Sequence, residues 1–198
     1  MGPVATALLL QAAFVLLAFG WRTLAQHRAT GSTGFVAHRE RGLVAKAAGL
    51  ALTLGLLAVV AGTLLADPRD WDAPAYGGVV AMLGGLVLCL AAQRAMGASW
   101  RIGVDPDERT ALITTGLFGT MRNPIFTAMI LFATGSALAV PTLVTVLGLV
   151  VATAGIVAQV LAVEEPHLRR QHGTDYDAYV SRSGRFLPRL ARTDRAAA

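Results

Sequence analysis

Five long stretches of the chain contain no charged residue, and every charged residue lies outside them. The stretches are Val4–Trp21, Ala47–Ala66, Tyr76–Gln93, Ile125–Val140 and Thr142–Val163. A helix needs about 20 apolar residues to cross the roughly 30 Å hydrocarbon core of a bilayer. The pattern therefore predicts an all-α, polytopic membrane protein with five transmembrane helices.

The last two stretches are separated only by Pro141. This spacing predicts a tight helical hairpin whose outer ends meet at one face of the membrane. Ile125–Val140 is the shortest stretch, so we expect its start to be drawn into the membrane, or the helix to lean on its neighbours rather than on lipid. Beyond the hairpin, His167–Ser183 is predicted to form a C-terminal helix whose apolar residues share a face.

The net charge of +5 changes meaning once the positions of the basic residues are considered. Sixteen of the 17 Lys and Arg residues follow the first, third or fifth stretch, and Arg69 is the exception. Basic residues concentrate in cytoplasmic loops. We therefore expect an integral protein of a plasma membrane, prokaryotic by its Arg-rich, Lys-poor composition, with the N-terminus outside and the C-terminal helix cytoplasmic. The basic residues lack the interleaved aromatics of a nucleic-acid surface, so no nucleic-acid partner is expected.

Nothing in the sequence marks a second domain. We treat residues 1–198 as one membrane domain, with 1–94 a three-helix scaffold and 95–198 the half that carries the chemistry. Cys89 is the sole cysteine, so it forms no internal disulfide and is expected to fill space in the core. The histidines show no metal-ligand spacing, and no metal is expected. Small residues at Gly77, Ala81 and Gly85 favour close helix packing within the chain, although a dimer face stays open.

Two polar features flank the predicted hairpin. Asn123 followed by Pro124 is a strong helix start, because Asn is favoured as an N-cap and Pro at the first helical position. With Arg122 beside it, this helix N-terminus attracts an anion. At the other end of the hairpin, Glu164 and Glu165 end an apolar helix, where the helix dipole disfavours negative charge.

An acidic pair at that position indicates a cationic partner. The partner is either an arginine, with Arg122 and Arg169 as candidates, or a bound cationic ligand. Because the hairpin brings Arg122 and Asn123 close to Glu164 and Glu165, the site offers both signs of charge. It suits a zwitterionic ligand such as an amino acid moiety.

These residues belong to a longer series of motifs that runs from Ser99 to Pro188. The series contains Gly116-Leu117-Phe118, Arg122-Asn123-Pro124-Ile125-Phe126, Glu164-Glu165-Pro166-His167-Leu168, His172-Gly173-Thr174-Asp175-Tyr176-Asp177-Ala178-Tyr179 and Arg185-Phe186-Leu187-Pro188. In this order the chain resembles the isoprenylcysteine carboxyl methyltransferase and phospholipid methyltransferase family of integral-membrane methyltransferases. That family shows G-x-Y, R-H-P-x-Y-x-G, E-E-x-x-L, F-G-x-x-Y-x-x-Y and R-F-I-P.

The resemblance implies an enzyme that uses S-adenosylmethionine, bound near the cytoplasmic face beneath the C-terminal tail. A lipophilic or lipid-linked acceptor would enter from the bilayer. The implied catalytic residues are Arg122, Asn123 and Glu165. The implied cofactor-binding residues are Gly116, Leu117, Arg122, Asn123, Pro124, Glu164, Glu165, Tyr176 and Tyr179, with Leu168 and Arg185 in supporting positions.

Three positions depart from the family pattern. Asn123 stands in place of the motif His, Phe126 in place of Tyr and Ala128 in place of Gly. Asn forms hydrogen bonds but does not titrate near neutral pH. If the family's His moves a proton, this chain must do so with another group.

Methyl transfer needs alignment and exclusion of water more than covalent chemistry. We expect Arg122 and the helix start to hold the cofactor carboxylate, and one glutamate to hold its ammonium or ribose. The other glutamate would orient the acceptor or take its proton. Two alternatives stay open: an NADPH-dependent membrane reductase of the sterol-reductase type, and a non-catalytic membrane protein that retains the fold. The acceptor, whether a carboxylate, amine, thiol or hydroxyl, is not identified by the sequence.

Overall fold

The computed structural model describes residues 1–36, 42–103 and 111–189. The elements of these ranges are α1 (Pro3–Phe14), η1 (Val15–Trp21), α2 (Arg22–Thr30), α3 (Leu43–Leu64), α4 (Ala73–Met96), η3 (Gly97–Ser99), α5 (Leu117–Thr120), α6 (Pro124–Ala139), α7 (Leu143–Gln159), η4 (Val160–Glu164), α8 (Glu165–His172) and α9 (Thr174–Arg182). The described residues contain no β-strand, and their β geometry is limited to isolated bridges. The all-α prediction is confirmed for this part of the chain.

Four helical segments of the described residues are long and apolar enough to cross a membrane. They are Pro3–Thr30, Leu43–Leu64, Ala73–Ser99 and Leu143–His172. The predicted fourth span forms α6, which has 16 residues and is shorter than these four. As expected, α6 leans on its neighbours, since it contacts α1, α3, α4 and α7. The number of five spans stays a prediction.

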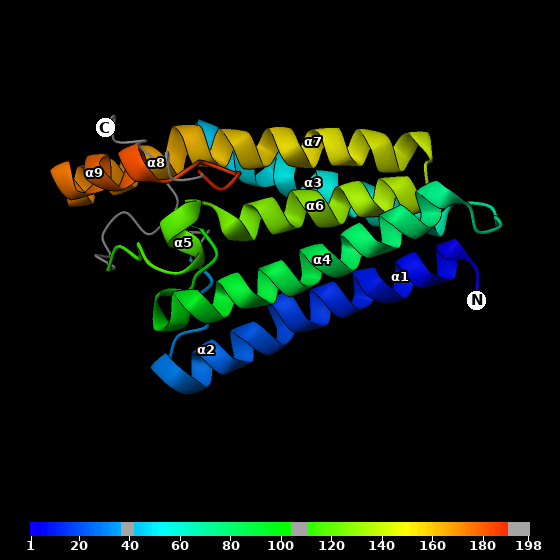
Figure 1. The fold of residues 1–198 in the computed structure, drawn as a ribbon, viewed down its shortest axis with the longest axis horizontal. Coiled ribbons are helices and arrows are strands. Elements are labelled where there is room, and N and C mark those ends of the chain that lie inside the picture. The colour runs from blue at the N-terminus through cyan, green and yellow to red at the C-terminus, as the bar shows by residue number, and fades with distance from the viewer. Residues whose placement is uncertain (37–41, 104–110, 190–198) are drawn as a thin grey trace, which may run out of the picture.

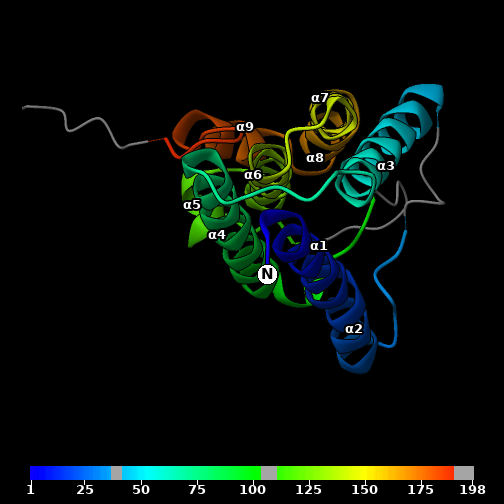
Figure 2. The ribbon, with the colours of Figure 1, turned by 90° about the vertical axis from the view of Figure 1, so that its right-hand side faces the viewer.

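The bundle is built from two closely packed helix pairs, α3 with α7 and α4 with α6, and α1 lies alongside (Figure 2). Glycines allow the close approach. A Cβ atom on Gly85 would lie 2.8 Å from the backbone oxygen of Ala128 in α6, and one on Gly55 would lie 2.2 Å from the backbone nitrogen of Ala152 in α7. Gly85 therefore serves packing within the chain, whereas Gly77 has nothing within 4 Å.

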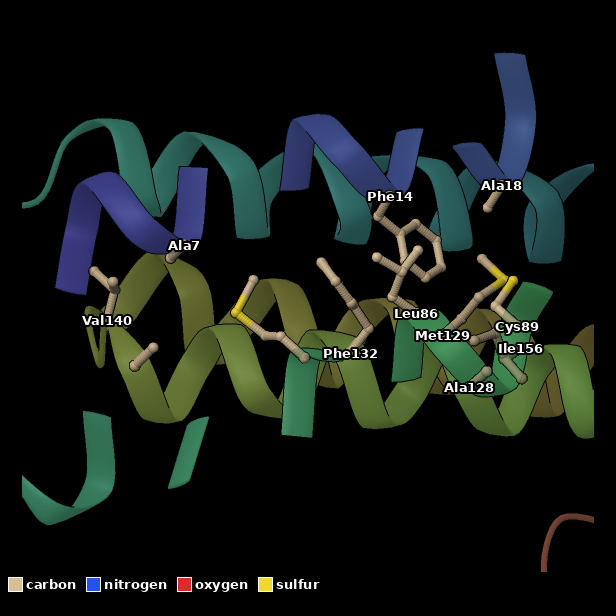
Figure 3. Close-up of a cluster of buried hydrophobic side chains, with 12 residues drawn as sticks. Ala7, Phe14, Ala18, Leu86, Cys89, Ala128, Met129, Phe132, Val140 and Ile156 are labelled. Atoms are coloured by element: carbon tan, nitrogen blue, oxygen red, sulfur yellow. The ribbon is translucent and has the colours of Figure 1, made fainter. Parts of the chain in front are cut away.

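Buried apolar side chains of α1, α4 and α6 form the centre of the bundle (Figure 3). The rings of Phe14 and Phe132 lie 4.3 Å apart between their centroids. Cys89 is buried in the same cluster and free of a disulfide, so its predicted role as a small filler is confirmed. Leu and Val side chains cover the outer faces of the long helices, which is the arrangement expected when lipid is the solvent.

At one end of the bundle, α2 ends and α6 begins (Figure 1). We call this end, which also holds α5, α8 and α9, the site end. The exceptional arginine, Arg69, lies at the opposite end and has a structural role there. Its Nη1 donates to the carbonyl of Ala139 at 3.0 Å, which satisfies a carbonyl at the C-terminus of α6. Which end faces the cytoplasm stays a prediction.

Candidate active site

The hairpin brings Arg122 and Glu165 into direct contact at the site end. Arg122 Nη2 lies 3.2 Å from Glu165 Oε1, although the two residues are 43 positions apart. Both side chains are buried, with 7% and 9% of their surface exposed. A buried pair of this kind is stable only when its remaining hydrogen-bonding capacity is also used.

A second arginine completes that pairing. Arg185 donates from Nε to Glu165 Oε1 at 2.7 Å and from Nη2 to Oε2 at 2.9 Å. The bond to Glu165 raises the pKa of Arg185 above its ordinary value. Arg122 and Arg169 were the arginines expected beside the acidic pair, and for Glu165 the partner is Arg122. Arg169 pairs instead with Asp177 at 2.9 Å.

The expected helix end at Glu164 and Glu165 is wrong. α7 continues through the π-helical turn η4 into α8, so the helix runs from Leu143 to His172. The acidic pair therefore lies inside a helix, and the dipole argument does not apply to it. Single π-helical turns inside longer helices are frequent at functional sites, and here the turn immediately precedes Glu165.

The expected start of α6 is correct in position but not in its capping bond. Pro124 is the first helical residue, and Asn123 occupies the N-cap without a side-chain capping bond. The Asn123 amide instead donates from Nδ2 to the carbonyl of Arg185 at 3.0 Å. The reason is that the tail already lies alongside this helix start, since the carbonyl of Gly184 accepts from the Arg122 backbone N–H at 2.8 Å.

The C-terminal tail is fixed to the same place by further bonds. Thr127 Oγ1 donates to the carbonyl of Phe186 at 2.7 Å, and Arg122 Nη1 donates to the carbonyl of Ser183 at 2.6 Å. Arg122 therefore contacts both Glu165 and the tail. These bonds hold the tail against the start of α6 and the side chain of Arg122, so residues 183–186 are not a free extension.

Two tyrosines of α9 close another side of the site. Tyr176 and Tyr179 are buried, and their ring centroids lie 6.1 Å apart. The Tyr179 hydroxyl donates to the carbonyl of Phe118 in α5 at 2.7 Å. Burial raises the pKa of each phenol to about 12, so both are neutral at physiological pH. The predicted C-terminal helix is two helices, because the chain turns at Gly173 with φ of 52°.

These elements surround a pocket of about 130 Å³ that is partly open to solvent. The described residues that line it are Met96, Ser99, Arg101, Gly103, Ala111, Leu112, Ile113, Phe118, Arg122, Asn123, Glu164, Glu165, His167, Leu168, Tyr176 and Tyr179. The pocket presents cations, carboxylates and aromatic rings within one space.

The pocket and its charges lie in the half of the chain that a family model also recognises. The model for phospholipid methyltransferases matches residues 74–175, which is just over half of the chain. The chain belongs to the phospholipid methyltransferase family. No curated protein matches the chain.

Membership of this family makes the protein a membrane methyltransferase and confirms the resemblance drawn from the motifs. The match covers α4, α6, α7 and α8. It includes Arg122, Glu164 and Glu165 and ends just before Tyr176. Arg185, which holds Glu165, lies beyond it.

The pocket gathers six of the nine cofactor-binding residues expected from the sequence: Arg122, Asn123, Glu164, Glu165, Tyr176 and Tyr179. Gly116, Leu117 and Pro124 are not among its lining residues. Gly116 has φ of 59°, a backbone conformation that favours glycine. It begins the short helix α5 from which Phe118 reaches the pocket.

Sequence reasoning missed one whole wall. Residues 96, 99, 101, 103 and 111–113 line the pocket, and they come from the end of α4 and the segment that follows it. Trp100, in the same segment, is 2% exposed and packs under the guanidinium of Arg22, whose Cζ lies 4.9 Å from the ring centroid. The positions of the charges could have indicated this wall. Arg101 and Arg122 both follow the third uncharged stretch, so both are expected at the same face of the membrane.

Proposed function

We propose that the chain transfers a methyl group from S-adenosylmethionine to a lipophilic or lipid-linked acceptor at the cytoplasmic membrane face. The observation that carries this proposal is the shared pocket of Arg122, Glu164 and Glu165 at the site end. A cation and two acids in one partly buried pocket suit the zwitterionic amino acid part of this cofactor. The family match supports methyl transfer over the alternative of a reductase.

The residues present fit the cofactor chemically. Within the described residues, the buried Arg122 Nε has no hydrogen-bond partner, although Nη1 and Nη2 are engaged. A buried guanidinium N–H without a partner is costly, and a carboxylate oxygen would satisfy it. Phe118, Tyr176 and Tyr179 line the same pocket with aromatic rings. These rings would contact the adenine and help to exclude water.

The bound cofactor would supply a sulfonium methyl group, which a nucleophile takes by in-line displacement. We assign Arg122 and the start of α6 to the cofactor carboxylate, where the helix dipole adds positive potential. Glu164 or Glu165 would hold the ammonium or ribose. Asn123 would orient the site through its amide, because an amide forms hydrogen bonds without titrating.

The acceptor would approach through the bilayer. The long helices expose Leu and Val along their outer faces, so lipid surrounds the bundle up to the site end. A lipophilic acceptor is already concentrated in that solvent. The chain thus needs no water-filled route for it.

Binding of the cofactor tests this proposal directly. Purified protein in detergent is titrated calorimetrically with S-adenosylmethionine, S-adenosylhomocysteine and NADPH. We expect both sulfur ligands to bind, and Arg122→Ala and Glu165→Gln to weaken binding at least tenfold. The matched controls are Arg170→Ala and Asp175→Asn, which change exposed residues outside the pocket.

The possible outcomes separate the alternatives. Heat from NADPH alone would favour the reductase. No heat from any of the three ligands, in protein that unfolds cooperatively, would favour a non-catalytic membrane protein. Equal binding by Arg122→Ala and by its control would remove Arg122 from the site.

A further inference from the structure

One titratable residue in the pocket has no role in the function proposed above. His167 lies in α8, two residues after Glu165, and is 6% exposed. Its side chain lines the same pocket as Asn123 and Glu165. His27 and His172, the other histidines of the described residues, are not among the lining residues.

Most polar groups around this pocket are unsuited to accept a proton. Both oxygens of Glu165 already accept hydrogen bonds from Arg122 and Arg185. Arg122 and Arg101 are cations and have no acceptor atom. The Asn123 amide does not titrate, and it donates to the tail.

The tyrosines are no better suited. With the pKa of each raised to about 12 by burial, Tyr176 and Tyr179 stay protonated at pH 7. The Tyr179 hydroxyl is also committed as a donor to Phe118. The charged and titratable groups that line the pocket with His167 are Arg101, Arg122, Glu164, Glu165, Tyr176 and Tyr179.

Glu164 and His167 are therefore the two candidates for a proton acceptor. Glu164 is half-buried in η4, and a carboxylate is a weak base toward a group that must be deprotonated near neutral pH. Imidazole ordinarily titrates between pH 5 and 8, which matches a general base working at pH 7. The buried His167 is the better match.

We propose that His167 accepts the proton of the methyl acceptor, and that this acceptor is a protic nucleophile, an amine or a hydroxyl, rather than a carboxylate. This inference rests on the proposed methyl transfer. A lone pair of the acceptor nitrogen or oxygen forms the bond to the methyl carbon. The carbon–sulfur bond breaks with its electron pair moving to sulfur, which becomes a neutral thioether. The proton leaves the acceptor for the His167 imidazole and then passes to solvent.

The position of His167 also accounts for a departure noted in the sequence. Asn123 occupies the place of a motif histidine, and it lines the pocket that contains His167. The two residues are 44 positions apart in the sequence, and the hairpin brings both to the same pocket. An imidazole is thus present in this pocket without one at position 123.

Turnover provides the first test. Methyl transfer from radiolabelled S-adenosylmethionine is measured in mixed micelles that contain phosphatidylethanolamine, a long-chain alkylphenol or palmitic acid. On the amine or phenol probe, we expect His167→Gln to lower kcat about 10²- to 10⁴-fold at pH 7. The loss should shrink as the pH rises and the acceptor deprotonates in water. His172→Gln, the control on the same helix, should leave kcat unchanged.

Ligand binding and turnover together separate a failure of the proposed methyl transfer from a failure of the role of His167. S-adenosylhomocysteine should bind His167→Gln with a Kd within twofold of the unsubstituted protein. Failure of the unsubstituted protein to bind it would overturn the proposed methyl transfer itself. Binding with an unchanged kcat in His167→Gln, turnover on palmitic acid alone, or loss of kcat only in Glu164→Gln would overturn the role of His167 and leave methyl transfer standing.

A spectroscopic measurement is independent of turnover. In protein labelled with ¹³C-histidine, the His167 Cε1–H signal is assigned by its disappearance in His167→Gln. We expect this signal to change with pH and its pH dependence to shift when S-adenosylhomocysteine binds, while the His172 signal does not respond to the ligand. A His167 signal that does not move with pH, or does not respond to the ligand, would contradict the proposal even if none of the three lipid probes is methylated.

Discussion

Arg185 binds both carboxylate oxygens of Glu165, with Nε 2.7 Å from Oε1 and Nη2 2.9 Å from Oε2. This pair joins the C-terminal tail to α8, and Arg122 joins the same carboxylate to the start of α6. Three segments far apart in the sequence thus converge on one buried side chain. The position of the Glu165 carboxylate in the pocket therefore depends on one arginine from the start of α6 and one from the C-terminal tail.

The first prediction concerns this two-point contact. Arg185→Ala should lower the free energy of unfolding by about 1 to 2 kcal/mol, since it removes two charge-assisted bonds from a half-exposed arginine. Arg185→Lys should recover only part of the loss, because an ammonium does not reproduce the planar fork. Thermal unfolding in detergent measures both. Arg182→Ala, an exposed neighbour on α9, is the control, and an equal loss there would show that the pairing is not responsible.

The second prediction concerns the contact of α4 with α6. Gly85→Ala places a Cβ atom 2.8 Å from backbone atoms of Ala128 and Phe132. Backbone cannot move aside cheaply, so we expect a cost of about 1 to 3 kcal/mol. Gly77→Ala, on the same helix with open space around it, should be neutral or stabilising by up to about 1 kcal/mol. Comparison of the two unfolding temperatures checks this, and similar values would contradict the packing.

Much of the bundle follows from hydrophobic pattern alone. The stretch Ile125–Val140 predicts α6 to within one residue at each end. Pro141 predicts the hairpin, and the hairpin predicts that Arg122 approaches Glu165. These inferences succeed because short connections and the length of an apolar run constrain geometry directly.

Other features depend on contacts that no local pattern encodes. The first predicted span ends at Trp21, but the helix runs to Thr30, because charged residues at a bundle end are compatible with continued helix. The π-helical turn before Glu165 and the pairing of Glu165 with Arg185 arise from tertiary structure. His167 lies in a recognised motif, and its position two residues after Glu165 already suggests that it lines the site, as the structure shows.

The third prediction concerns alkaline stability. The pKa of Tyr176 and of Tyr179 is raised by burial from 10.0 to about 12 in the folded protein. The folded state therefore keeps these protons in a range where unfolded tyrosine loses them. The stabilising contribution is complete below pH 10 and is lost as the pH rises toward 12. We expect the unfolding temperature to fall across that interval.

The test of this explanation uses single substitutions. Tyr176→Phe should flatten the decline between pH 10 and 12, because phenylalanine has no proton to lose. Tyr76→Phe, an exposed position on α4, serves as the matched control and should leave the decline as it is. An absorbance titration of the phenolates near 295 nm reports ionisation directly. If the decline is identical in all three proteins, other groups cause it.

The last prediction concerns orientation in the membrane. Cys89 is the sole cysteine and is buried, so Cys89→Ser gives a background for single-cysteine labelling. In that background, Ala178→Cys on α9 reports the site end and Ala73→Cys at the start of α4 reports the opposite end. Because basic residues favour the cytoplasm, a membrane-impermeant maleimide should label Ala73→Cys in intact spheroplasts and Ala178→Cys only in inverted vesicles. The reverse result would place the site end outside, away from the cytoplasmic pool of nucleoside cofactors, and would contradict the proposed function as well as the charge rule.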